Sequence, residues 1–224
     1  MRTLSIFKTV SALAAASVLA VIASGGKASA ITFNLGGPVP TGPQVASSFT
    51  YSEGGISLTA TGAGPLIARN VFRVNDGATN NGLGVTFTNS NLENNQVDGF
   101  LFSETLTLAF NQAVNLTSVS FSRVGSNDNF TFLNNGAVVF NNQVIAGGNG
   151  TDTGTGTFNF ASQAGTSFGF RAGQANDDFY VSSVEVTAVP EPITIAGMIM
   201  GSGFGVVLRR KYKKAAKLST KMSS

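Results

Sequence analysis

Between Ile31 and Val186, short apolar segments alternate with polar positions and are interrupted by Gly, Asn, Asp and Pro. Alternation with a period of two is typical of β-strands that bury one face, whereas a helix repeats its apolar residues every three to four positions. No part of this region has a helical period, so the pattern predicts an all-β chain. The expected strands are 31–35, 47–51, 56–61, 70–74, 83–88, 105–110, 116–123, 129–133, 137–140, 157–160, 167–171 and 179–186.

The spacing of apolar residues also predicts the register of two of these strands. In LTSVSFSR (116–123), Leu116, Val119 and Phe121 share one face only if a bulge or turn absorbs the odd spacing between the first two. In FYVSSVEV (179–186) the spacing is regular, and Val184 and Val186 are expected to face one way.

Turn residues separate the expected strands. Asn135-Gly136 predicts a hairpin, Asp76-Gly77 and Asn81-Gly82 punctuate a longer connection, and the Gly-rich segment 147–156 predicts a flexible surface loop that buries nothing. Many short strands joined in this way predict two packed antiparallel sheets, a β-sandwich that resembles a jelly roll. Sixteen Phe residues in this region would supply most of its core.

The first thirty residues have the pattern of a secretory signal peptide. Arg2 and Lys8 precede an apolar run at 9–24 that is too short to span a membrane comfortably, and Ala28 and Ala30 flank Ser29 in a small-residue cleavage box. We expect a signal-peptide helix at 1–30 and cleavage after Ala30. The remaining chain then divides into a secreted domain (31–187), a C-terminal module (188–217) and a short tail (218–224).

The C-terminal module combines an extended motif, an apolar span and a basic cluster. Val189, Pro190, Glu191 and Pro192 are expected to be extended, since proline restricts both itself and the residue before it. The uncharged stretch 193–208 would span about 24 Å as a helix at about 1.5 Å per residue, slightly less than a bilayer core. The cluster that begins with Arg209, Arg210 and Lys211 would help it to cross and would remain in the cytoplasm. We therefore predict a transmembrane helix with the body outside.

Charge is distributed unevenly along the chain. Of the 14 basic residues, three lie in the predicted signal peptide and seven in the C-terminal tail. The secreted region keeps only Arg69, Arg73, Arg123 and Arg171 against ten acids, a net charge of about −6. Nucleic acid binding requires a clustered basic surface on the folded part, and this region provides none.

The absence of certain residue types excludes much chemistry. The chain has no His and no Cys, and no Lys lies between Ala28 and Leu208. Nucleophilic triads that use His, Schiff-base chemistry and the usual zinc or copper sites therefore cannot be assembled. We expect no catalytic residue and no cofactor, and the chain is not predicted to be an enzyme.

Carboxylates are the remaining reactive groups, and they allow two alternatives. Glu104 with Asp98, or Asp177 with Asp178, could be proposed as a catalytic pair of a glycan-active enzyme, although neighbouring strand residues such as the latter two point to opposite faces. The same four acids could ligate Ca²⁺, which needs only oxygen ligands. Turn chemistry alone also explains Asp and Asn at such places.

Together, the Pro-Glu-Pro motif at 190–192, the apolar span and the basic cluster resemble the PEP-CTERM sorting signal of Gram-negative bacteria, including cyanobacteria. The segments VDGFLFSETLTLAF (97–110) and DDFYVSSVEV (177–186) are similar in style to proteins that carry it. The resemblance implies recognition by an exosortase, which would remove the tail during export through the secretion machinery. It also implies a transient stay in the inner membrane and a final place at the cell surface or in the extracellular matrix.

These observations lead to one preferred function and two alternatives. We expect an exported, non-enzymatic surface or matrix protein associated with exopolysaccharide and biofilm. A carbohydrate-binding module is the first alternative, disfavoured by the absence of Trp and by only two Tyr residues in this region, Tyr51 and Tyr180. A carboxylate-dependent glycan-active enzyme is the second.

Overall fold

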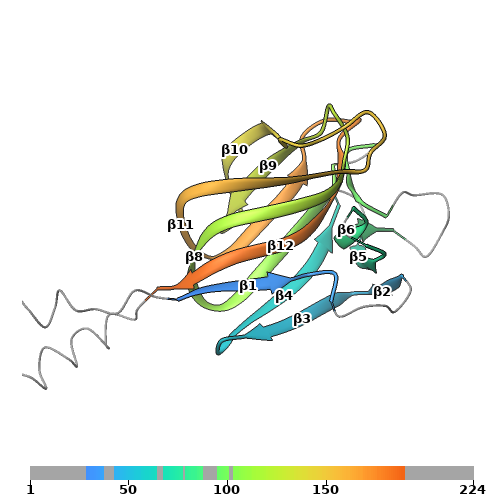
Figure 1. Cartoon of the computed structure of the whole chain (residues 1–224). Coiled ribbons are helices and arrows are strands. Elements are labelled where there is room, and N and C mark those ends of the chain that lie inside the picture. Colours follow the sequence, from blue (N-terminus) through green and yellow to red (C-terminus); the bar gives the residue numbers. More distant parts are fainter. Residues whose placement is uncertain are drawn as a thin grey trace, which may run out of the picture. The chain divides into compact units, whose positions relative to one another are not determined.

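Strands make up most of the described chain, and none of its residues is helical. The computed structural model describes residues 29–37, 43–64, 68–77, 79–87, 95–100 and 103–189, all within one compact unit (Figure 1). Over these ranges no helix is long and apolar enough to cross a membrane. The all-β prediction is therefore confirmed. The strands are β1 (Ala30–Asn34), β2 (Gln44–Ala46), β3 (Ser48–Glu53), β4 (Ile56–Ala63), β5 (Ala68–Asn75), β6 (Asn81–Thr86), β7 (Val97–Asp98), β8 (Thr105–Val124), β9 (Asn129–Asn134), β10 (Ala137–Val144), β11 (Gly154–Ala172) and β12 (Asp178–Ala188).

The named strands pair antiparallel in the order β1-β12-β6-β5-β4-β8-β11-β9-β10. Three short strands join from the side: β2 pairs with β5, β3 with β4, and β7 with β12. A further pairing of β12 with β8 closes the path β12-β6-β5-β4-β8 into a ring. The first and last strands of the unit, β1 and β12, are also partners, with Ala30 opposite Thr187.

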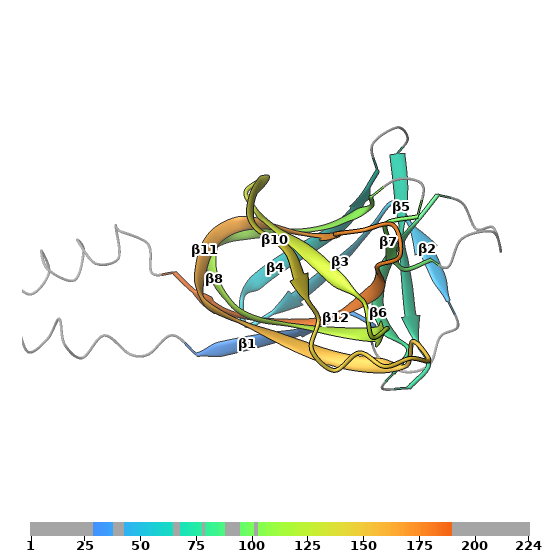
Figure 2. The same cartoon turned by 90° about the horizontal axis from the view of Figure 1, so that it is seen from above.

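Two long bent strands, β8 and β11, organise the unit. They run side by side and bend together, so that each contributes to two arms (Figure 2). In one arm, the start of β8 pairs with β4, and in the other its end pairs with β12. The sequence predicts two strands in place of each, and this is wrong. Both bends lie within continuous strands, and shifts in register at 109–114 of β8 and 159–167 of β11 absorb them.

The predicted register of both apolar segments is confirmed. Leu116, Val119 and Phe121 are all buried, and the pairing of β8 with β12 shifts between Leu116 and Ser118, where a bulge was expected. In β12, Val184 and Val186 are also buried.

The turn predictions have mixed outcomes. Asn135 and Gly136 form the two-residue turn between β9 and β10, both with positive φ, as expected for a hairpin. Asn81-Gly82, however, begins β6 and is not a turn. A Cβ on Gly82 would lie 2.5 Å from the carbonyl oxygen of Val181, so this glycine permits β12 to pass close to β6.

The Gly-rich segment 147–156 is packed, contrary to the prediction of a loop that buries nothing. Its last residues belong to β11, and Gly154 is buried. A Cβ on Gly148 would lie 1.9 Å from the carbonyl oxygen of Gly125, because Asn149 forms a parallel bridge with Gly125. The glycines thus allow backbones to approach one another, a role that composition alone does not distinguish from flexibility.

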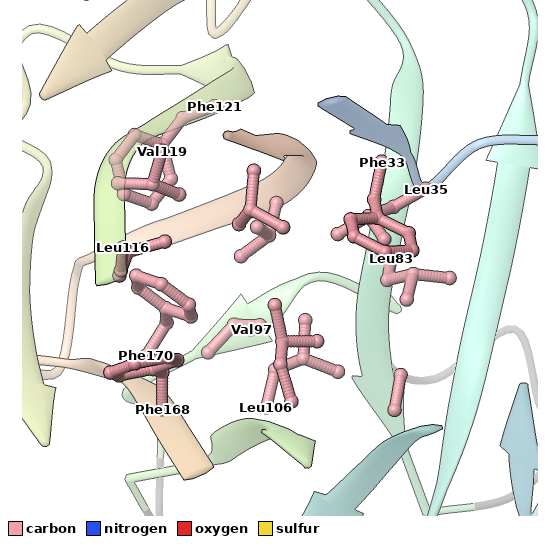
Figure 3. Close-up of a cluster of buried hydrophobic side chains, with 14 of the residues drawn as sticks. Phe33, Leu35, Leu83, Val97, Leu106, Leu116, Val119, Phe121, Phe168 and Phe170 are labelled. Carbon is pink, nitrogen blue, oxygen red and sulfur yellow. The ribbon is translucent and has the colours of Figure 1, made fainter. Parts of the chain in front are cut away.

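Phenylalanine dominates the core, as the sequence predicts. Side chains from both arms point into the space between them (Figure 3). Ring contacts connect phenylalanines from six strands, and Phe132 alone contacts four other rings, with centroids 4.6 to 6.0 Å away. The network comprises Phe33, Phe110, Phe121, Phe130, Phe132, Phe140, Phe158, Phe160, Phe168, Phe170 and Phe179.

Candidate functional site

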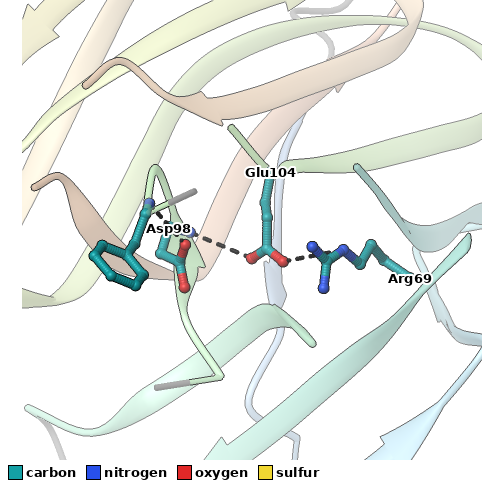
Figure 4. A network of polar contacts seen from close by, with 4 residues as sticks. Arg69, Asp98 and Glu104 are labelled. Carbon is teal, nitrogen blue, oxygen red and sulfur yellow. Dashed lines mark hydrogen bonds and ion pairs between the residues drawn. The ribbon is translucent and has the colours of Figure 1, made fainter. Parts of the chain in front are cut away.

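Glu104 and Asp98 lie at the two ends of the connection between β7 and β8. Glu104 is only 2% exposed, and its Oε1 lies 3.4 Å from Nε of Arg69 (Figure 4). Its Oε2 accepts a hydrogen bond from the backbone N–H of Asp98 at 3.4 Å, while Asp98 Oδ1 accepts one from the N–H of Phe100 at 3.0 Å. Both carboxylates therefore hold this connection in place.

Asp177 and Asp178 are adjacent in sequence but have different partners. Asp177 is 1% exposed, and its Oδ1 accepts hydrogen bonds from the backbone and side-chain nitrogens of Asn129 at 3.1 and 3.3 Å. Asp178 Oδ1 instead accepts one from Nε2 of Gln96 at 2.8 Å. Asp178 is also the cross-strand partner of Asp98. The structure thus brings the predicted acids to one corner, where their oxygens accept hydrogen bonds from backbone N–H groups and amide side chains.

Asp128 joins the same corner; the sequence places it in an oxygen-rich segment (126–129), but not among the four acids named as candidate ligands. Its Oδ2 accepts a hydrogen bond from the N–H of Gly125 at 2.5 Å, and its Oδ1 accepts one from the N–H of Asp178 at 3.3 Å. Burial raises the pKa of Asp128 from 3.8 to about 6; the two N–H groups oppose this shift, and the charges of Asp178 and Asp177 add to it. Burial likewise raises the pKa of Asp177, against the hydrogen bonds from Gln174 and Asn129.

Acids that lie close together are potential ligands of a metal ion such as Ca²⁺. Across the described ranges, no group of three or more His, Cys, Asp or Glu side chains could hold a metal ion. Ca²⁺ ligation by Asp98, Glu104, Asp177 and Asp178 stays a prediction.

A second feature, which we call the β1–β3 cleft, opens between two strands that do not pair with each other. It has a volume of about 480 Å³, within the usual range for ligand sites. Phe33 is buried and Tyr51 half-buried, whereas the polar side chains that alternate with them are exposed. The cleft is lined by Thr32, Phe33, Asn34, Gly37, Thr50, Tyr51, Ser52, Glu53 and Arg73.

Arg73 reaches this cleft from β5. Its NH2 donates a hydrogen bond to Oε1 of Gln44, its partner on β2, and its guanidinium carbon lies 4.5 Å from the centre of the Phe49 ring. Burial raises the pKa of Tyr51 to about 12, although the neighbouring guanidinium opposes the shift. Tyr51 therefore stays neutral near pH 7, and its hydroxyl donates to the carbonyl oxygen of Leu35.

A smaller pocket of about 370 Å³ has a neutral lining. Ser120 and Thr157 from neighbouring strands contact each other there, with hydroxyl oxygens 3.0 Å apart. The pocket is lined by Asn81, Ser120, Phe121, Thr155, Gly156, Thr157 and Ser182.

Sequence reasoning missed Arg73 and Tyr51 as site residues. The signal that could have found Arg73 is its rarity, as one of four basic residues in an acidic region. Several predicted residues lie outside the described residues: Ala28 of the cleavage box, Pro190, Glu191 and Pro192 of the sorting motif, and Arg209, Arg210 and Lys211 of the basic cluster.

Three comparisons were made with known proteins. No protein-family model, no curated protein and no solved structure matched this chain. The sequence patterns and the geometry of the described unit therefore carry the functional argument.

Proposed function

We propose that this chain is an exported, non-enzymatic protein of the cell surface or extracellular matrix that associates with exopolysaccharide. The observation that carries the proposal is the order of its parts: a signal-peptide pattern, an acidic region, then Pro-Glu-Pro, an apolar span and a basic cluster. An exosortase would recognise the segment around 189–192 and remove the tail, so that the membrane helix holds the chain only until processing.

We further propose that the all-β unit is a sandwich of the jelly-roll type. The two arms formed by β8 and β11 support this, because side chains between the arms form the core. The additional pairing of β8 with β12 joins the two arms into one hydrogen-bonded sheet, so the layers of the proposed sandwich are connected.

The non-enzymatic assignment is supported by how the acids are used. A glycan-cleaving pair needs two carboxyl groups on either side of a bound sugar. Glu104 and Asp177 are buried instead, and their oxygens accept hydrogen bonds from backbone N–H groups. Release of reducing sugar from candidate polysaccharides would favour the enzyme alternative.

A carbohydrate-binding module is the second candidate function. The β1–β3 cleft favours it, since exposed hydroxyl and amide side chains surround a neutral tyrosine there. Co-sedimentation of the full-length chain with exopolysaccharide tests this property separately from sorting.

The sorting proposal is tested by changing Pro190, Glu191 and Pro192 to Ala and measuring the intact mass and cell fraction of the product. We expect the unchanged chain to reach the surface without its tail, and the variant to stay at the inner membrane with its tail. Changing Pro38 and Pro40 to Ala, far from the motif in sequence, is the matched control. Full-length protein in the membrane for all three chains would refute sorting.

A further inference from the structure

Arg73 is a cation whose observed partners in the β1–β3 cleft are neutral. No carboxylate of the described residues forms an ion pair with it; its guanidinium donates a hydrogen bond to Gln44, lies beside Tyr51 and stacks on the ring of Phe49. A guanidinium carries five N–H donors in a planar fork that matches a carboxylate. In a region with ten acids and four arginines, a cation that forms no ion pair among the described residues and lies beside a cleft favours an anionic ligand.

The shape of the cleft disfavours an extended peptide that would add a strand to β1 or β3. At one end, the hydroxyl of Tyr51 bonds to the carbonyl oxygen of Leu35. At the other end, Ile31 packs so closely on Gly54 that a Cβ there would lie 2.6 Å from Cδ1 of Ile31. An added peptide strand would have to run past both contacts, along the edges of β1 and β3. A compact group that enters from the open side fits better.

The rim of the cleft matches hydroxyl groups. Thr32, Asn34, Thr50 and Ser52 are exposed and line it from both strands, so hydroxyls and an amide lie near the half-buried side chains of Tyr51 and Arg73. Glu53 is an acid on this rim, where it is exposed and its charge is screened by solvent.

We propose that the β1–β3 cleft binds an acidic sugar residue of a polysaccharide, with the sugar carboxylate on the guanidinium of Arg73. The rim side chains hydrogen-bond to the ring hydroxyls, and the half-buried ring of Tyr51 contacts the sugar ring. The inference rests on the proposed association with polysaccharide and adds its chemical class and its place.

The test is calorimetric titration of the full-length chain with a galacturonic acid tetramer, and with the methyl ester of the same tetramer. We expect binding of the acid only. Arg73→Gln should weaken it by about ten- to a hundredfold, the usual value of a hydrogen bond to a charged group, and Arg73→Lys by less. Arg171→Gln removes the same charge outside the cleft and should leave affinity unchanged.

A second variant leaves the side chains of Tyr51 and Arg73 unchanged, in case Arg73→Gln disturbs folding. Glu53→Gln removes the like charge on the rim, and we expect binding a few times tighter. Equal binding of the ester, an equal loss in Arg73→Gln and Arg171→Gln, or equal binding of a glutamate tetramer would overturn the inference. If the chain co-sediments with neutral polysaccharide but ignores the acid tetramer, the inference fails and the proposed function stands; if it binds neither, both fail.

Discussion

The raised pKa of Asp128 predicts that the unit is more stable in mild acid than at neutral pH. A carboxyl whose folded pKa lies above its unfolded value contributes full stability below the unfolded pKa, 3.8, and loses it as the pH rises through about 6. The difference between 3.8 and about 6 would be worth about 3 kcal/mol at about 1.36 kcal/mol per pH unit, and screening by solvent lowers this to about 1 to 2 kcal/mol. For a unit of this size, that is about 2 to 8 °C in melting temperature.

The assay is thermal unfolding of the full-length chain between pH 4 and pH 8, followed by far-ultraviolet circular dichroism because the chain has no Trp. We expect the melting temperature to fall as the pH rises. Asp128→Asn should flatten most of this slope. The same substitution should also lower the free energy of unfolding at pH 4 by about 1 to 2 kcal/mol. The amide keeps one acceptor oxygen, so one of the two hydrogen bonds from the N–H groups of Gly125 and Asp178 is lost.

Two comparisons separate this cause from general effects of pH. Asp76→Asn changes an exposed turn acid and should preserve the slope. Asp177, whose pKa is also raised, should leave a remainder of the same sign in Asp128→Asn. A melting temperature that rises from pH 4 to pH 7, or an undiminished slope in Asp128→Asn, would show that the reasoning about burial is wrong.

Two further predictions concern packing, each measured as the free energy of unfolding. Gly148→Ala should destabilise the unit by about 1 to 3 kcal/mol, since its Cβ would meet the carbonyl oxygen of Gly125. Gly150→Ala is the control and should change stability little, because the space around Gly150 is open. Equal effects of the two substitutions would indicate that segment 147–156 is loosely packed. Phe132→Ala should lower the free energy of unfolding by about 3 to 5 kcal/mol, because four other rings lose a contact. Phe100→Ala, at a side chain that is 70% exposed, should lower it by less than about 0.5 kcal/mol. A small effect of Phe132→Ala would mean that neighbouring side chains fill the space.

Apolar alternation predicted most strands, because it records which face each residue buries. The short strands β2 and β7, of three and two residues, were missed because a strand of two or three residues is too short to show an alternating pattern. The joining of segments into β8 and β11 was missed for another reason: a bulge in a continuous strand and a break between strands both interrupt the period. Asn81-Gly82 was misread because a glycine needed for close approach resembles a turn glycine.

The site was less predictable than the strands. The sequence identified Asp98, Glu104, Asp177 and Asp178 as oxygen donors, but their hydrogen-bond partners depend on long-range pairing, such as that of β7 with β12. Arg73 was visible as a rare cation, yet only folding brings it beside Tyr51 between two strands that do not pair.

The pairing of β1 with β12 has a consequence for how the chain folds. These strands are separated by almost the whole unit, so β1 lacks its hydrogen-bonded partner β12 until β12 has been synthesised. Contacts over such long sequence distances form slowly, and unpaired strand edges associate with other chains while they wait. We therefore expect refolding from denaturant to be slow, with β1 protected from hydrogen exchange only in the final phase.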